Sequence, residues 1–383
     1  MNQTIRRLLQ TIFVVGLLSV GSVNFAQERP AELKPWTEQM RSRYENLLLR
    51  DWNPQRPDHV AVTRVAKARF PVIDVHNHIE APRDPARLDQ AIAEMDAANV
   101  RTVVALTCGW EATLQRNIDE LAGRFPGRFL ICTQVDINSI DAPNFTETAV
   151  ERLREAKRMG AVGIKFRKDL GCYLKDRTGS YVAVNDSRFD AVWDAAGKLG
   201  LPVMIHVADP IAFFQPWDEK NPAYPKLLKN PAFYFHGPDW AGTMRFTHDE
   251  LLQQFEDILT RFPETTFCGL HYASLEHDFE RLSSLLDKHP NLLIETGARN
   301  WTLGIKPNSG RKFALRYQDR IMFGTDMRID RAVYERFFRT LETDDDNIET
   351  DLSWGTVHGI HLPDEVLEKI YRKNAMKLFG LNE

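Results

Sequence analysis

The sequence predicts an α/β protein whose main domain is a closed (β/α)8 barrel, or TIM barrel, and three observations support this. From Pro71 onward, short runs rich in β-branched and aromatic residues alternate with amphipathic helical patterns, which is typical of βα units around a parallel sheet. Eight such runs are present, the number that closes a barrel. No GxGxxG motif follows the first run, so the alternative, an open doubly wound sheet, lacks its main sequence mark.

The expected strands are short and apolar. They cover residues 72–76, 102–107, 129–135, 163–166, 203–207, 266–271, 292–296 and 321–324. Helical periodicity between them predicts helices over residues 88–98, 146–159, 188–199, 248–261 and 276–288. Thr247 and Glu250 form a capping-box pattern before the fourth of these helices. A final helix over residues 363–379 is expected to stop at Gly380.

The first 26 residues are predicted to be a removable export signal. Arg6 and Arg7 form its positive region, residues 11–23 its apolar region, and Ala26 its small terminal residue. A membrane anchor is the alternative, but about 13 apolar residues are fewer than the roughly 20 that a spanning helix needs. We therefore expect an exported protein, periplasmic or secreted.

An extension over residues 27–69 is predicted to precede the barrel domain over residues 70–383. The extension contains one helical pattern over residues 35–50 and is expected to wrap around the outside or bottom of the barrel. After the fifth strand, residues 208–246 form a long insertion that is rich in aromatic residues, Trp217 among them. Such an insertion at a barrel rim can be a lid or pocket wall, or its aromatic side chains can simply pack the loop together.

Composition and charge limit the classes of partner. The 383-residue chain is 43% hydrophobic and 27% charged, with a formal net charge of −4. Removal of the signal deletes Arg6 and Arg7 and no acidic residue, so the mature chain is more acidic. A mildly acidic protein has no electrostatic reason to bind nucleic acid or anionic membranes. We expect a small-molecule substrate, no nucleic-acid partner, and no stable membrane insertion after cleavage.

Residues that commonly bind metals lie at the ends of several predicted strands. Alternation along the first strand places His76 and His78 on one face, with Asp74 on the same face. His206 and His271 end the fifth and sixth strands, and Asp326 follows the eighth. The ends of barrel strands meet at one rim, where a metal ion can satisfy polar groups that would be costly to bury alone. Imidazoles with a carboxylate suit Zn²⁺ first, with Mn²⁺, Fe²⁺ or Co²⁺ as alternatives.

The expected chemistry follows from this set of residues. A bound ion would lower the pKa of a water molecule and polarise a substrate carbonyl. Asp326 could accept the proton of the water and pass it to the leaving group. His271 would either bind a second ion, or orient the water and polarise the carbonyl.

At these residues the sequence resembles the amidohydrolase superfamily, and more closely its amidohydrolase-related (amidohydrolase 2) branch of metal-dependent hydrolases and decarboxylases. The resemblance covers residues 70–381 and rests on five motifs: Ile73-Asp74-Val75-His76-Asn77-His78, Met204-Ile205-His206, Gly269-Leu270-His271, Phe323-Gly324-Thr325-Asp326 and Ile370-Tyr371-Arg372-Lys373-Asn374-Ala375. It implies one catalytic metal held by His76, His78, His206 and Asp326, with His271 as the catalytic histidine. It also implies a homodimer.

Lys165 ends the fourth predicted strand and has two interpretations. By the same resemblance, a lysine at this place can become a carbamate that bridges two metals, and His206 and His271 would then serve the second ion. The alternative is an ordinary amine that faces the substrate or forms an ion pair. Because carbamylation needs a neutral amine, the first interpretation requires a lowered pKa. The resembled branch is usually mononuclear, so we expect one metal.

Four basic residues beyond strand ends are candidates for substrate contact: Arg167, Lys168, Arg299 and Arg328. Rim arginines can hold a carboxylate in a bidentate fork, although each of these charges could also be solvated or structural. Trp217 of the aromatic insertion is a further candidate.

The leading functional hypothesis is an exported hydrolase that cleaves an amide, ester or lactone bond with metal-activated water. The alternative enzyme is a metal-dependent non-oxidative decarboxylase of a small carboxylate, since the site residues fit either reaction. A binuclear phosphotriesterase-like hydrolase depends on Lys165 alone. A non-catalytic barrel that only binds a metal or ligand is the last alternative, and the presence of every expected ligand argues against it.

Overall fold

A computed structural model describes residues 38–48, 51–52, 62–82, 84–348 and 355–382. The chain divides into two units, Met1–His59 and Val60–Glu383. The predicted export signal lies outside the described residues. In the first unit, α2 (Glu38–Glu45) lies within the expected helix but is shorter, because residues 46–48 leave the helix and residues 35–37 and 49–50 are outside the described part. The expected wrapping of the barrel by the extension stays a prediction.

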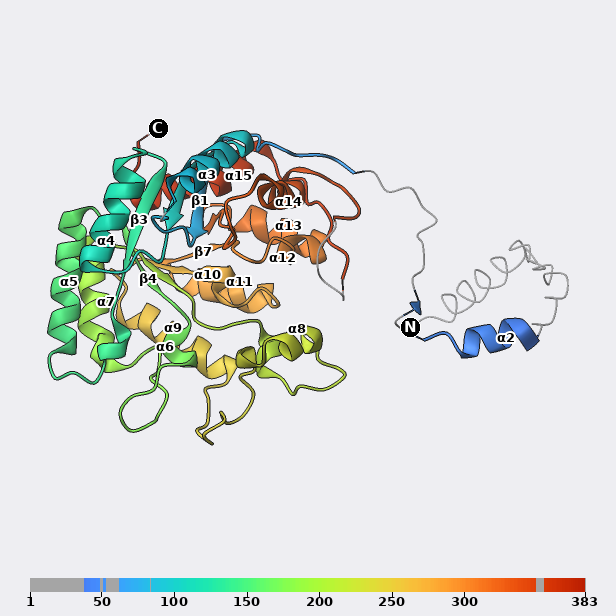
Figure 1. Ribbon diagram of the computed structural model, residues 1–383, viewed down its shortest axis with the longest axis horizontal. Helices are drawn as coiled ribbons and strands as arrows, with labels where there is room; N and C mark the ends of the chain where they lie inside the picture. Colours follow the sequence, from blue (N-terminus) through green and yellow to red (C-terminus); the bar gives the residue numbers. More distant parts are fainter. Residues whose placement is uncertain (1–37, 49–50, 53–61, 83, 349–354, 383) are drawn as a thin grey trace, which may run out of the picture. The chain divides into compact units, whose positions relative to one another are not determined.

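In the second unit, eight parallel strands form one sheet whose strand order follows the chain (Figure 1). They are β1 (Val72–Asn77), β2 (Val100–Ala105), β3 (Phe129–Gln134), β4 (Gly163–Phe166), β5 (Val203–Ile205), β6 (Phe267–Gly269), β7 (Leu292–Glu295) and β8 (Ile321–Met322). The backbone N–H of Val75 donates to the carbonyl of Phe323 (2.9 Å), and that of Asp326 donates to the carbonyl of His76 (2.7 Å). These two bonds join the chain directly after β8 to β1, so the predicted (β/α)8 barrel is confirmed.

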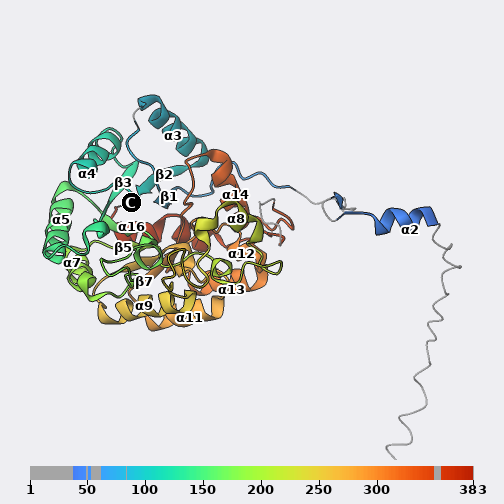
Figure 2. The same cartoon turned by 60° about the horizontal axis from the view of Figure 1, so that its bottom comes forward.

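Helices alternate with the strands around the outside of the barrel (Figures 1 and 2). They are α3 (Pro85–Ala98), α4 (Glu111–Asn117), α5 (Phe145–Met159), α6 (Asp169–Cys172), α7 (Asp190–Leu199), α8 (Tyr224–Lys229), α9 (His248–Arg261), α10 (Leu270–Ala273), α11 (Phe279–Lys288), α12 (Thr302–Ile305), α13 (Pro307–Arg316), α14 (Arg331–Glu342), α15 (Asp364–Glu368) and α16 (Asn374–Phe379). A π-helical turn, Lys369–Lys373, joins the last two. None of these helices has the length and hydropathy that a membrane span requires.

The five helices expected between the strands are all present, and caps explain where two of them begin. The Asp84 side chain accepts a hydrogen bond from the N–H of Ala86, so α3 begins three residues earlier than expected. Asp278 accepts from the N–H groups of Glu280 and Arg281, so α11 begins only after it. An aspartate at such a position accepts from donors that a helix leaves unpaired at its start. The capping box of Thr247 on α9 is confirmed.

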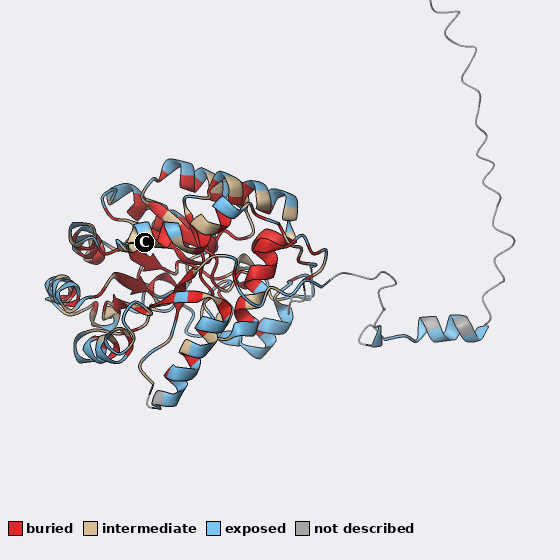
Figure 3. Ribbon diagram, turned by 90° about the horizontal axis from the view of Figure 1, so that it is seen from above, coloured by how far each residue is buried: buried red, intermediate tan, exposed pale blue. Residues whose placement is uncertain are grey.

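The barrel interior is packed with apolar side chains, and Figure 3 shows the buried strands inside helices whose outer faces are exposed. The interior cluster consists of Ile73, Val75, Val104, Leu106, Cys132, Met204, Cys268, Leu270, Met322 and Ala375. Met376 and Phe379 of α16 pack against it. The Asn374 side chain donates to the carbonyl of Ile321, at the start of β8 (2.7 Å). The C-terminal helix thus covers the end where the strands begin, and the site lies where they finish.

The aromatic insertion is well packed. Phe213 stacks on Phe233 with ring centroids 5.8 Å apart, and Phe214 stacks on Phe235 at 5.0 Å. Trp217 lies between Tyr224 and Tyr234, at 5.9 and 5.8 Å. These contacts support the interpretation of the aromatic residues as packing for the loop.

Candidate metal centre

A register shift in β1 decides which of its side chains reach the site. The pairing of β1 with β2 shifts between Asp74 and Asn77, and such a bulge moves side chains to the other face. Asp74 accepts hydrogen bonds from the N–H (2.9 Å) and hydroxyl (2.7 Å) of Thr325 and from Tyr334 of α14 (3.1 Å). The expectation that Asp74 shares a face with His76 is therefore wrong. Asp74 holds the loop after β8, and burial raises its pKa to about 6.

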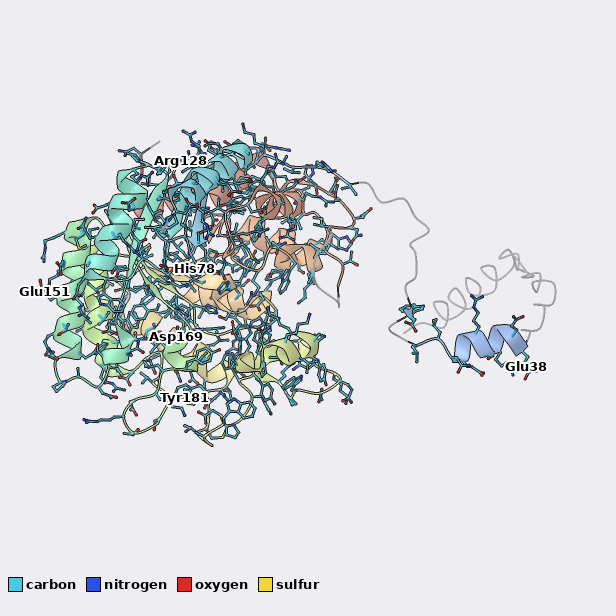
Figure 4. The ribbon with its side chains drawn as sticks, viewed as in Figure 1. Glu38, His78, Arg128, Glu151, Asp169 and Tyr181 are labelled. Atoms are coloured by element: carbon cyan, nitrogen blue, oxygen red, sulfur yellow. The ribbon has the colours of Figure 1, made fainter. Side chains whose placement is uncertain are left out.

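Three of the predicted ligands come together across the seam between β1 and β8. Nε2 of His76 lies 3.4 Å, and Nε2 of His78 lies 2.9 Å, from Oδ1 of Asp326. Their ligand atoms all lie within 4.8 Å of one another, a spacing that allows one ion to contact all three. Nδ1 of His78 lies 3.2 Å from the hydroxyl of Thr107. Figure 4 shows His78 near the middle of the barrel, whereas Glu151 of α5 lies at its outer surface.

The carboxylate of Asp326 is ionised and faces three imidazoles. Burial alone would raise its pKa, but His76, the hydrogen bond from His78, and His271 together hold the pKa well below the ordinary value. Nε2 of His271 lies 3.7 Å from Oδ2 of Asp326. Burial lowers the pKa of His76 and of His271 well below the usual value, so both imidazoles are neutral at pH 7.

His271 lies in a left-handed backbone turn after β6. Four consecutive residues, His271, Tyr272, Ala273 and Ser274, have φ angles of 56°, 57°, 53° and 61°. Residues other than glycine rarely adopt this conformation, because each costs roughly 1–2 kcal/mol. Such strain persists where the surrounding structure holds it, often at functional sites. Nδ1 of His271 lies 2.7 Å from the carbonyl oxygen of Gly297.

A second group that could hold a metal contains a residue that the sequence reasoning missed, Glu295 at the end of β7. Its carboxylate is fully buried, and its Oε1 lies 3.1 Å from Nδ1 of His76. His76, His271 and Glu295 together form this second group. Burial raises the pKa of Glu295, while His271 acts against that rise. The signal in the sequence was a lone acid at the end of an otherwise apolar strand.

His206 lies beside His271 but outside both of these groups. The two rings have centroids 4.3 Å apart, and Nε2 of His206 lies 3.4 Å from Oδ1 of Asp209. Lys168 pairs with the other oxygen of Asp209 at 2.5 Å. Lys168 is therefore part of a buried network around His206. Asp209, which sequence reasoning also missed, lies four residues after the end of β5.

Lys165 of β4 points into the barrel. Its amine is buried and has no hydrogen-bond partner within the described part of the chain. Burial lowers its pKa to about 8, although Asp326 and Glu295 act to raise it. A neutral fraction of the amine is therefore accessible near neutral pH, and both interpretations of Lys165 stay open.

The residues present fit a divalent metal ion. The Nε2 atoms of His76, His206 and His271 are buried without a hydrogen-bond partner among the described residues. Buried polar atoms normally have partners, and neutral imidazole nitrogens are good ligands for Zn²⁺ and similar ions. A cation among these nitrogens and the Asp326 carboxylate would satisfy them.

The family model described as Amidohydrolase matches residues 66–381. The chain belongs to the amidohydrolase family. This family is metal-dependent, in agreement with the donor groups above. No curated protein sequence matches the chain.

Solved structures of other proteins share the fold of this amidohydrolase. An uncharacterized TIM-barrel protein from Bordetella bronchiseptica is 15% identical, with 81% of this chain and 98% of that chain covered and a TM-score of 0.50. A 2,6-dihydroxybenzoate decarboxylase is 16% identical (82% and 100% covered, TM-score 0.52). A 5-carboxyvanillate decarboxylase from Novosphingobium aromaticivorans, complexed with manganese, is 14% identical (84% and 100% covered, TM-score 0.50). At these identities the likeness shows the TIM-barrel fold.

Two cavities adjoin the site of this amidohydrolase. One of about 550 Å³ is lined by Lys165 and Arg167 together with Trp110 and Tyr173. The other, of about 720 Å³, is lined by His78, Asp326 and Arg328, and by the apolar residues Ile79, Met327, Ile329 and, from α14, Val333. Residues of the aromatic insertion line neither cavity.

The candidate substrate contacts thus have different surroundings. Arg167 and Arg328 each line a cavity, although Arg167 lies 3.0 Å from Asp169 and Arg328 lies 3.1 Å from Asp330. Arg299 is buried, and its Nε lies 3.2 Å from Glu276. Arg299 therefore has a buried acidic partner within the protein. Trp217 lies in the aromatic cluster of the insertion, and its contact with substrate stays a prediction.

Proposed function

We propose that this protein is a metal-dependent hydrolase that cleaves an amide, ester or lactone bond in a small molecule. The observation that carries the proposal is the position of Asp326. Its carboxylate faces the Nε2 atoms of His76, His78 and His271 at 3.4, 2.9 and 3.7 Å. A carboxylate so placed can touch a metal ion with one oxygen and a reacting water with the other.

The ion would be held by His76, His78 and Asp326. We propose His206 as the fourth ligand, because its Nε2 is buried and makes no hydrogen bond among the described residues, although it faces Oδ1 of Asp209 at 3.4 Å. Zn²⁺ is our first choice, with Mn²⁺, Fe²⁺ or Co²⁺ as alternatives. When bound, the ion would polarise a substrate carbonyl and lower the pKa of a water. A second ion would require carbamylation of Lys165, and we propose a single one.

The residues of the chain supply the proton transfers. Asp326 is ionised, so it can accept the proton of the attacking water and then return it to the leaving group. His271 is neutral and presents Nε2 toward Asp326, where it can orient the water or contact the substrate carbonyl. The packed barrel interior excludes bulk water behind these groups.

Decarboxylation of a small carboxylate is the second candidate. Lys165 and Arg167 line the same 550 Å³ cavity, and a pair of cations next to the metal ligands suits a substrate that carries a carboxylate. The decarboxylases among the solved structures share the fold with this chain, and the same set of ligands could serve their reaction.

The test is a substrate screen with the Zn²⁺-loaded protein and the Mn²⁺-loaded protein, with Asp326→Asn as the inactive control. Lactones, esters, amides and small aromatic or keto carboxylates are incubated with the protein in H₂¹⁸O. The masses of the products are then measured by mass spectrometry. Incorporation of one ¹⁸O atom would support the hydrolase. Loss of CO₂ without ¹⁸O would favour the decarboxylase, and no product from any metal-loaded form would favour the non-catalytic binding barrel. We also propose export, on the charge and hydropathy pattern of residues 1–26.

A further inference from the structure

One carboxylate lies behind two residues of the candidate centre. Oε1 of Glu295 lies 3.1 Å from Nδ1 of His76 and accepts a 2.6 Å hydrogen bond from the backbone N–H of His271. Oε2 accepts a hydrogen bond from the N–H of Gly297. A single buried side chain therefore contacts β1, the turn after β6 and the second residue after β7.

These contacts determine which ring nitrogens carry hydrogen. A carbonyl oxygen only accepts, so Nδ1 of His271 must donate to the carbonyl of Gly297 at 2.7 Å. Each oxygen of Glu295 already accepts a backbone N–H, which leaves the carboxylate an acceptor toward Nδ1 of His76. A neutral imidazole carries only one N–H, so each neutral ring then presents an unprotonated Nε2. Both Nε2 atoms are buried with no hydrogen-bond partner in the part of the chain described.

Two glycines make room for the carboxylate. A Cβ atom at Gly297 would lie 2.6 Å from Oε2 of Glu295 and 2.7 Å from Nδ1 of His76. A Cβ atom at Gly324 would lie 2.3 Å from the same Oε2. All three distances are far below ordinary contact, so the backbone directly after β7 and after β8 approaches Glu295 as only glycine allows.

The same carboxylate holds one end of the left-handed turn. It accepts from the N–H of His271, the first of the four residues with positive φ. At the other end, the hydroxyl of Ser274 donates to the carbonyl of Ala208 at 2.6 Å. The turn therefore has an anchor at each end, and the anchor nearer the site is Glu295.

We propose that Glu295 is a positioning residue that fixes the protonation of His76 and His271 and turns both Nε2 atoms toward the cation, without being a ligand itself. Its two oxygens are engaged by three donors, and they contact His76 on the Nδ1 side, away from Nε2. Outer carboxylates of this kind orient the histidines that bind metals in proteins. The inference rests on the proposed metal-dependent function.

The experiment compares Glu295→Gln with a matched control, Glu342→Gln. Glu342 is also a buried glutamate, and it accepts from the N–H of Arg69 (3.2 Å) and from Tyr371 (2.9 Å), away from the candidate ligands. The first readout is ¹⁵N NMR of the histidine rings in the metal-free protein. The second is the affinity for Zn²⁺ alone, measured by competition with a chelator.

In the wild type we expect His76 and His271 to be protonated at Nδ1. Glu295→Gln should mix the tautomers of both rings and weaken Zn²⁺ binding by about 10- to 100-fold. Glu342→Gln should leave both readouts unchanged even where its melting temperature falls. If folded Glu295→Gln keeps the tautomers of both rings, the proposal is overturned. If that variant also fails to bind Zn²⁺, Glu295 would be a direct ligand of the ion and not a positioning residue.

The two proposals can fail separately. A wild type that binds no Zn²⁺ contradicts the proposed function, while the tautomers still test Glu295. Where Glu295→Gln does not fold, Glu295→Asp takes its place, because it keeps the charge but withdraws the carboxylate by one methylene. We expect Glu295→Asp to mix the tautomers and to weaken Zn²⁺ binding in the same way. If neither change is seen, the positioning role of Glu295 is contradicted.

Discussion

His78 and Asp326 belong to opposite ends of the barrel sequence, yet Nε2 of His78 lies 2.9 Å from Oδ1 of Asp326. The backbone hydrogen bond from Asp326 to the carbonyl of His76 lies beside this contact. Barrel closure and assembly of the candidate centre therefore use the same residues. The predictions below test the roles of individual groups around this seam.

Asp326→Asn is expected to lower kcat by about 10²- to 10⁴-fold, because an amide keeps the shape of the side chain but cannot accept a proton. The measurement is the turnover of whichever substrate the screen identifies, with circular dichroism to confirm folding. Asp319→Asn, a change at an exposed aspartate paired with Lys369, is the matched control. An unchanged kcat in Asp326→Asn would remove this carboxylate from the mechanism.

The double variant His76→Ala/His78→Ala is expected to lose its metal. Elemental analysis of the wild type should find about one equivalent of a divalent transition metal per chain, in line with a site built on imidazoles and a carboxylate. A chelator should also lower the melting temperature of the wild type and not that of the variant, because a ligand stabilises the state that binds it. Two equivalents would contradict the single-ion proposal and point to a carbamate at Lys165.

Lys165→Met is expected to change how stability depends on pH. Burial lowers the pKa of Lys165 from 10.5 to about 8, so the unfolded chain binds more protons between these values, and the wild type gains stability as the pH rises through them. This gain in the free energy of unfolding is about 3 kcal/mol. It is lost again as the pH falls through 8.

The check is urea unfolding of the metal-free proteins in CO₂-free buffer. The stability of Lys165→Met relative to the wild type should fall by roughly that 3 kcal/mol between pH 7 and pH 11. If the difference in unfolding free energy between Lys165→Met and the wild type does not vary with pH, the amine of Lys165 is not a buried, unpaired cation.

Arg299→Ala is expected to destabilise the protein by roughly 3–5 kcal/mol, because it leaves Glu276 as an unpaired buried charge. Arg316→Ala is the control: it removes an exposed ion pair with Asp287, and the expected loss is below about 1 kcal/mol. Denaturant unfolding of both variants measures the difference. A loss of activity in Arg299→Ala with full stability would instead indicate the substrate contact that the sequence suggested.

Much of the fold could be predicted from sequence, because each strand is a separate apolar run and each helix has its own period. His76, His78 and Asp326 were predictable for the same reason: strands of a parallel barrel finish at one rim, so polar residues at their ends meet. The family model confirms the resemblance that these motifs carried.

The remaining features depend on contacts that a sequence pattern does not encode. The pattern places Asp74 with His76, but a bulge in β1 turns it toward Thr325 and Tyr334. Glu295 gains its role only through three donors, those of His76, His271 and Gly297, and Glu295 itself lies in none of the motifs. His206 directly follows its strand, close to the expected place, yet Asp209 lies at its Nε2, which only the fold of the following loop could show.

The hydrogen bonds between β8 and β1 also bear on how the chain is made. During synthesis, residues 72–78 emerge early and Asp326 emerges near the end. Strands β2 to β7 can pair with their neighbours in the order in which they appear, but the two ends of the sheet meet last. The complete candidate centre therefore cannot exist on a partly made chain, and an ion can meet its full set of ligands only once the ring of strands has closed.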